Sequence, residues 1–107
     1  MIMEKHDLGI SVKDLSEDQP IAGSIDGKEL VVLLHMGRVY AMDRFCTHEN
    51  GDLSQGYIDG EELICPLHSG AFYLEGGMAN EDTPWVTSLN SFRVEADPES
   101  GNLFVYF

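Results

Sequence analysis

The sequence predicts a small all-β protein with roughly eight to ten short strands, because its turns have the spacing typical of sandwiches and barrels. Turn-forming Gly, Pro, Asn and Asp residues interrupt the chain at short intervals. No segment keeps the 3.6-residue periodicity of an amphipathic helix. The 107 residues contain no internal repeat, low-complexity tract or linker, which indicates one domain, large enough to bury a core without disulfides.

The N-terminal half is expected to form an antiparallel meander. Its strands are predicted at residues 5–12, 21–25, 29–35 and 38–42. The polar segment between the first two strands ends at Pro20 and is predicted to be a loop. Asp26-Gly27 is typical of a two-residue type I′ hairpin turn, and Met36-Gly37 marks the next turn.

The C-terminal half has shorter strands and longer loops. Its strands are predicted at residues 57–58, 61–64, 71–74, 91–96 and 103–107. Asp59-Gly60 is the expected turn of a hairpin whose second strand leads into Cys65. The polar residues 78–85 are predicted to form a loop, and residues 97–102 are predicted to close the last hairpin.

Both cysteines of the chain and two of its four histidines form two matched pairs. The first box holds Cys46 and His48, one residue apart, and the second holds Cys65 and His68, two residues apart. Two thiolates and two imidazoles can bind either a tetrahedral zinc ion or a [2Fe–2S] cluster. A disulfide between the cysteines is the alternative without a metal, but it needs no histidine beside each cysteine.

The pairing of unlike ligands favours the iron–sulfur cluster over zinc. Zinc fingers and ribbons usually keep like ligands together, as Cys-x-x-Cys and His-x₃₋₅-His. A cluster with two Cys on one iron and two His on the other instead takes one ligand of each kind from each of two loops. We therefore expect the two boxes to approach each other as near-symmetric loops, and zinc remains the alternative.

Both boxes and the sequence around them resemble the Rieske iron–sulfur proteins. Besides the boxes, the resemblance rests on Arg38–Asp43, Leu53-Ser54-Gln55-Gly56, Gly70-Ala71-Phe72 and Gly76-Gly77. It covers essentially the whole chain and is greatest for the small soluble Rieske ferredoxins that serve bacterial aromatic ring-hydroxylating oxygenases. It implies a Rieske-type antiparallel β-sandwich, a single domain over 1–107, with a small inserted cluster-binding subdomain at about 44–73.

The resemblance also implies a site and a function. One [2Fe–2S] cluster per chain would be held by Cys46 and Cys65 on the inner iron and by His48 and His68 on the outer, solvent-facing iron. The protein would be a one-electron carrier and not an enzyme. It would pass electrons from an NAD(P)H-dependent flavin reductase to a terminal oxygenase of aromatic hydrocarbon catabolism, and it would be a monomer.

Two alternatives stay open at this stage. One is a small Rieske-type subunit of a nitrite reductase or of another multisubunit oxidoreductase. The other, from a different class, is a zinc-stapled interaction module.

Departures from the respiratory Rieske proteins indicate a low reduction potential. Residues expected around the cluster are Pro66, Leu67, Ser69, Gly70 and Phe72. Gly51 and Leu67 stand where those proteins carry a disulfide, and Gly70 and Phe72 stand where they carry hydroxyls. Fewer bonds to the sulfurs predict a potential near the low end of the range of about −150 to +300 mV. Ser69 could supply one such bond or face solvent. The segment 85–89 lacks the proline often found there, so we expect the loop that shields the cluster to differ in shape.

The charge of the chain limits its partners. Nineteen acidic residues against six basic ones give a formal charge of −13, which disfavours nucleic acid and anionic membranes. The acidity serves either solubility or attraction to a basic partner. Acidic residues between the boxes could form a docking face, namely Glu49, Asp52, Asp59, Glu61 and Glu62.

The remaining features predict a cytoplasmic protein with few other functional residues. The N-terminus has no secretory signal pattern, and the aliphatic run 30–34 is too short to cross a bilayer. His6 and His35 lack partners at ligand spacing, so both are expected to lie at the surface. Trp85 is expected to serve packing.

Overall fold

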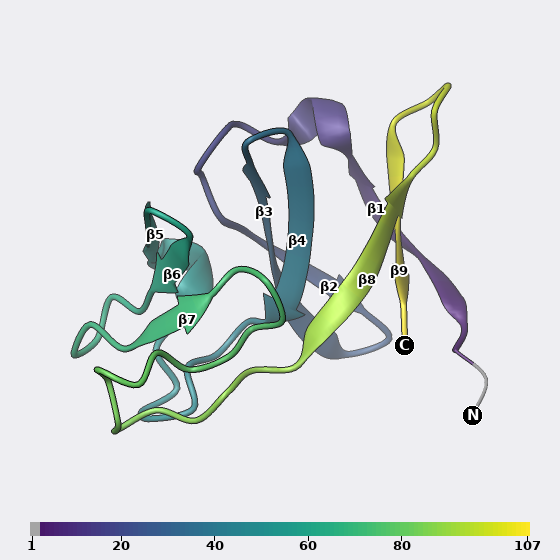
Figure 1. Cartoon of the computed structure of the whole chain (residues 1–107). Helices are drawn as coiled ribbons and strands as arrows, with labels where there is room; N and C mark the ends of the chain where they lie inside the picture. The colour runs from purple at the N-terminus through teal and green to yellow at the C-terminus, as the bar shows by residue number, and fades with distance from the viewer. Residues whose placement is uncertain (1–2) are drawn as a thin grey trace.

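The computed structural model describes residues 3–107 and consists almost entirely of strands (Figure 1). Its nine strands are β1 (Lys5–Ser11), β2 (Ile21–Ile25), β3 (Lys28–His35), β4 (Arg38–Asp43), β5 (Tyr57–Asp59), β6 (Glu62–Ile64), β7 (Ala71–Tyr73), β8 (Ser91–Ala96) and β9 (Asn102–Tyr106). Two single-turn 3₁₀ helices, η1 (Val12–Asp14) and η2 (Leu53–Gln55), complete it. The prediction of an all-β fold is confirmed.

A six-stranded antiparallel sheet in the order β1-β9-β8-β4-β3-β2 forms the sandwich. Only two residue pairs join its halves, Ala41 with Phe92 and Met42 with Ser91. The two halves therefore separate and fold over each other as two layers (Figure 1). A Cβ atom built at Gly23 of β2 would lie 3.2 Å from the Leu8 side chain of β1, which shows how closely the outer strands meet.

A second sheet, in the order β5-β6-β7, is inserted between β4 and β8. The chain leaves the sandwich after Asp43 and returns to it at Ser91. Figure 1 shows this small sheet beside the sandwich, with long loops below it. Among the described residues, no helix is long and apolar enough to cross a membrane.

Strand β3 joins the two parts because both of its faces are buried. Leu30 and Val32 point into the core between the sandwich layers. Val31 and Leu33 point into a second core, which the sandwich shares with the inserted sheet. All four side chains have no exposed surface. This explains why the strand is continuously apolar instead of alternating.

The hairpin turns at Asp26-Gly27 and Met36-Gly37 agree with the prediction from the sequence, and the turn of the β5–β6 hairpin differs. Asp26 and Gly27 have φ values of 50° and 83°, as a type I′ turn requires. In the β5–β6 hairpin, however, Asp59 pairs with Glu62, so the turn consists of Gly60 and Glu61 rather than Asp59 and Gly60. Gly60 has a φ of 60° and takes the first central position, which is typical of a type II′ turn.

The expectation that His35 lies at the surface is wrong, since only 8 % of the residue is exposed. Alternation along β3 places His35 on the same face as Val31 and Leu33, and the inserted sheet covers that face. Its ring nitrogens lie 2.6 Å from Asp18 and 3.1 Å from Glu61. His6 is half-buried and stacks on Phe107 with 4.1 Å between ring centroids.

Candidate metal centre

Two loops of similar construction carry the four predicted ligands. The first ligand loop, residues 46–51, follows β4, and the second, residues 65–70, follows β6. The Cys46 amide donates to the carbonyl of Gly51 at 2.8 Å, and the Cys65 amide donates to the carbonyl of Gly70 at 2.8 Å. Each loop is thus closed by a bond from its cysteine to the fifth residue after it. The near-symmetric approach expected from the sequence is present.

The loops separate the ligands by depth. Cys46 and Cys65 are 2 % and 1 % exposed, and both belong to the core beneath the loops. His48 and His68 are exposed, and their rings lie 5.4 Å apart between centroids at an angle of 74°. Both thiols are free, so the disulfide alternative is not supported. The structure therefore has a buried sulfur pair under an exposed imidazole pair.

The space around the sulfurs fits a cluster. A Cβ atom at Gly51 would lie 2.5 Å from the Cys65 sulfur, so only glycine leaves room there. The Leu67 amide donates to the same sulfur at 3.4 Å. Burial raises the pKa of the Cys65 thiol to about 11, and the neighbouring Cys46 adds to the rise. Such a thiol stays protonated at neutral pH unless a metal takes the place of its proton.

A third segment, residues 85–89, covers the ligand loops without the expected proline. The Thr47 hydroxyl donates to the carbonyl of Thr87 at 2.7 Å and accepts from the Thr87 amide at 2.8 Å. Val86 packs against Gly70, where a Cβ atom would lie 2.6 Å from the valine methyl group. Trp85 is 43 % exposed, so it is not a core residue.

The other residues predicted around the cluster occupy two environments. Phe72 and Gly70 are buried beneath the second ligand loop. Pro66, Leu67 and Ser69 are exposed, and Ser69 has a left-handed φ of 57°. A Cβ atom at Gly51 would lie 3.4 Å from the Leu67 Cβ, so the two positions compared with the respiratory disulfide face each other.

Three of the five acidic residues between the boxes pair with an arginine or a histidine. Asp52 binds Arg44 through two hydrogen bonds of 3.0 and 2.8 Å, and this guanidinium holds the pKa of Asp52 well below its usual range. Glu61 binds His35, and Glu49 Oε2 lies 3.0 Å from His68 Nε2. Sequence reasoning missed these contacts.

Thr47 and Arg44 are the residues in and beside the first box whose sequence positions already suggest a role at the site. Thr47 is polar and lies between two ligands. Arg44 is one of only six lysine and arginine residues in the chain and lies two positions before Cys46 of the first box. Both positions are readable without a structure, although their partners Thr87 and Asp52 are not.

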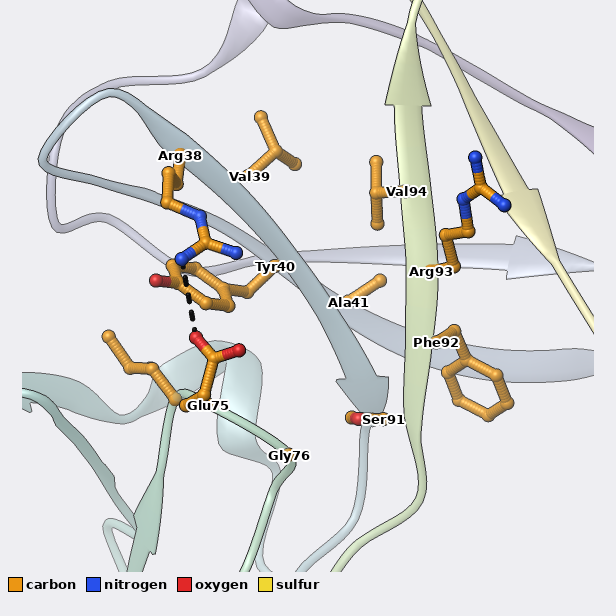
Figure 2. Close-up of a pocket in the computed structure, with 11 residues that line it drawn as sticks. Arg38, Val39, Tyr40, Ala41, Glu75, Gly76, Ser91, Phe92, Arg93 and Val94 are labelled. Atoms are coloured by element: carbon orange, nitrogen blue, oxygen red, sulfur yellow. Dashed lines mark hydrogen bonds and ion pairs between the residues drawn. The ribbon is translucent and has the colours of Figure 1, made fainter.

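One hollow on the described surface lies between the sandwich and the inserted sheet, away from the ligands. It has a volume of about 260 Å³ and lies between β4, β8 and the turn after β7 (Figure 2). Arg38 borders it and pairs with Glu75 at 3.3 Å, as the dashed line in Figure 2 marks. None of the four predicted ligands lines it.

Comparison with known families decides between the chemistries that this site allows. Residues 8–93 match the family model of the Rieske [2Fe-2S] domain. The chain belongs to this family. Its cofactor is therefore the [2Fe–2S] cluster of Rieske domains, as the paired boxes indicated, and not a zinc ion.

Individual relatives of this Rieske protein are ferredoxins. The chain is 37 % identical to the ferredoxin component of the naphthalene 1,2-dioxygenase system of Pseudomonas putida, over 48 residues. That match spans about half of each protein, 45 % of this chain and 46 % of the relative. The ferredoxin of Sphingomonas yanoikuyae B1 superposes with a TM-score of 0.84 at 28 % identity, covering 95 % of this chain and 97 % of that one.

Two further solved structures show how widely the fold is used. A complex of reduced oxygenase and oxidized ferredoxin in carbazole 1,9a-dioxygenase contains a chain similar to this Rieske protein. Its TM-score is 0.77 at 29 % identity, with 89 % of this chain and 95 % of that chain covered. A putative NADH-dependent nitrite reductase small subunit from Mycobacterium tuberculosis has a TM-score of 0.82, with 99 % and 95 % covered. Its 17 % identity shows the shared fold alone.

Proposed function

We propose that this protein is a Rieske ferredoxin that carries single electrons from an NAD(P)H-dependent flavin reductase to a terminal aromatic ring-hydroxylating oxygenase. The observation that carries the proposal is the separation of the ligands by depth. Cys46 and Cys65 would hold the inner iron in the core, and His48 and His68 would hold the outer iron at the surface. A bound cluster supplies a one-electron couple, and the exposed imidazoles give that couple its shortest route to a partner.

The surroundings of the site suit a carrier without a substrate of its own. Two hollows, of about 260 and 300 Å³, lie on the described surface, and none of the four ligands lines either of them. Phe45, directly before the first ligand loop, and Leu67, in the second, are 41 % and 46 % exposed. Exposed apolar side chains beside a redox site favour contact with a protein partner.

The likeness to dioxygenase ferredoxins supports an oxygenase as the electron acceptor. Its basis is the naphthalene dioxygenase ferredoxin component and the ferredoxin in complex with the carbazole dioxygenase oxygenase. A flavin reductase as donor, a cytoplasmic location and a monomeric state complete the proposal. The proposal also includes a single domain over residues 1–107, with a cluster-binding subdomain at about 44–73.

Spectroscopy of the purified protein tests the cluster and its role. We expect two irons and two acid-labile sulfides per chain, and an EPR signal after reduction with dithionite. The reduction potential should lie near the low end of the Rieske range, since Gly70 and Phe72 offer no hydroxyl to a sulfur. Zinc without labile sulfide would refute the cluster, and a potential near the high end would refute the low-potential donor.

The alternative of a nitrite reductase small subunit predicts a different behaviour in solution. A free carrier should elute near its mass of 11.9 kDa and accept electrons from a separately purified reductase. A subunit should copurify with a larger oxidoreductase chain and lose its electron supply when separated from it. Copurification and reductase assays therefore distinguish the two functions.

A further inference from the structure

The carboxylate of Glu49 links the two ligand loops. Glu49 directly follows His48 in the first loop, and its Oε2 atom lies 3.0 Å from Nε2 of His68 in the second. This hydrogen bond joins a side chain of the first loop to a predicted ligand of the second. Both side chains are about half exposed, at 55 % and 56 %. A residue of the first ligand loop therefore contacts the imidazole of the second.

We infer that Glu49 is a positioning residue for His68: its carboxylate accepts a hydrogen bond from Nε2–H of the imidazole and thereby lowers the reduction potential of the site. The inference rests on the proposed ligand set and deepens it. It gives an acidic residue of the first loop a part in setting the reduction potential.

The chemistry of the two groups determines the tautomer. A carboxylate can only accept a hydrogen bond, so Nε2 of a neutral His68 must carry the proton. The lone pair is then on Nδ1, which is the only ring nitrogen left to bind a metal. Histidines that bind metals commonly donate their other ring N–H to a carboxylate, which fixes the ring and makes it a stronger ligand.

The backbone holds both ends of the contact in place. In the first loop, the Asn50 amide donates to the carbonyl of Cys46 at 3.1 Å, and Asn50 has a left-handed φ of 56°. In the second loop, His68 itself has a φ of 62°. Left-handed non-glycine residues cost conformational energy and persist where the surrounding structure requires them. The contact thus joins two loops of fixed shape.

The contact has a direct consequence for the reduction potential. Reduction adds one negative charge to the cluster, and a carboxylate on a ligand imidazole disfavours that charge. A stronger imidazole ligand stabilises the oxidised state in the same direction. Glu49 should therefore lower the potential, in agreement with the role of an electron donor.

The test measures midpoint potentials of the cluster-loaded protein at one pH and one ionic strength. Glu49→Gln keeps the size of the side chain and removes its charge. We expect unchanged iron and sulfide, and a higher potential. A fivefold change in the ratio of oxidised to reduced protein corresponds to a rise of about 40 mV, at 59 mV per tenfold change for one electron. The EPR g values of the reduced protein should move with it.

Two matched variants distinguish the effect of the Glu49–His68 contact on the potential from the effect of net charge. Asp59→Asn removes an exposed charge at the far end of the β5–β6 hairpin and should leave the potential unchanged. Glu49→Asp keeps the charge but shortens the side chain, and it should raise the potential. The inference is overturned if Glu49→Gln keeps the wild-type potential, if Asp59→Asn raises it equally, or if Glu49→Asp leaves it unchanged.

The outcomes also keep this inference apart from the proposed function. If the wild-type protein assembles no cluster, the proposed function fails. If every variant assembles the cluster and the potentials do not move, only the role of Glu49 fails. If Glu49→Gln loses the cluster, the midpoint potential of Glu49→Asp still tests the contact, because this variant keeps the charge and shortens the side chain.

Discussion

At the scale of single residues, the space around the buried cysteine sulfurs limits which side chains can lie beside them. Gly51 has no left-handed backbone angle, so its conformation does not require glycine. Its Cβ position, however, would lie 2.5 Å from the Cys65 sulfur. Comparison with the respiratory proteins drew attention to this position as one without a cysteine. The structure adds a separate reason for glycine, which is space for a ligand atom.

The Gly51→Ala variant should lose most of its cluster, because the added methyl group displaces the Cys65 sulfur. Overpacking of this kind costs about 1–3 kcal/mol. Iron and acid-labile sulfide per chain measure the effect, and far-UV circular dichroism reports whether the sandwich remains folded. Gly60→Ala is the control, since Gly60 has open space around its Cβ position but a φ of 60°. It should lower stability and keep the cluster, and a full cluster in Gly51→Ala would contradict the argument.

The four predicted ligands and the contacts that support them differ in how far the sequence reveals them. Cys46, His48, Cys65 and His68 stand out because unlike ligands repeat at short spacing within the chain. The contact from Glu49 to His68 depends instead on how closely two loops approach in space. Glycine at position 51 depends on the same approach, and the Thr47–Thr87 pair depends on how segment 85–89 packs on the first loop, so no local pattern indicates these contacts.

At the scale of elements, three loops form the site and the strands set where they begin. The ligand loops are each closed by a hydrogen bond from cysteine to the fifth residue after it. Segment 85–89 then packs across both, through Thr87 on the first loop and Val86 on the second. The alternation of apolar residues and the positions of turn residues predicted the strands well. The β5–β6 turn was misplaced by one residue because a glycine there suits either central position.

The contact between Gly70 and Val86 can be tested by a double-mutant cycle. Gly70→Ala should destabilise the protein by about 1–3 kcal/mol, because the new methyl group would lie 2.6 Å from a Val86 methyl group. Val86→Ala removes that methyl group and makes room. Urea unfolding followed by circular dichroism should then show that the double variant loses less stability than the two single variants together. Strict additivity would mean that the segment does not pack on Gly70.

At the scale of the whole molecule, two features join the inserted sheet to the sandwich. Strand β3 supplies Val31 and Leu33 to the core that both parts share. Beyond them, at the end of the strand, His35 lies between Asp18 of the sandwich loop and Glu61 of the β5–β6 turn. Asp18 is held by its amide, which donates to the carbonyl of Leu34 at 2.7 Å. No local sequence pattern indicates this junction, because its three residues are far apart in the chain.

The His35 junction should make the stability of the protein depend on pH. Its hydrogen bond to Asp18, and then the one to Glu61, raise the pKa of His35 in the folded protein. A raised folded pKa means that protonation stabilises the fold. The contribution is complete below the unfolded pKa of about 6.5 and is lost as the pH rises through the higher folded value.

Comparison with His35→Gln, which cannot titrate, isolates this contribution from the many acidic groups of the chain. Free energies of unfolding in urea should differ most between the two proteins at about pH 6, where Asp18 and Glu61 remain ionised. The difference should shrink as the pH rises through the folded pKa. Glu61→Gln removes one acceptor and should show a smaller dependence. Because the junction spans both parts of the molecule, a difference that is constant with pH would mean that His35 joins them by packing alone.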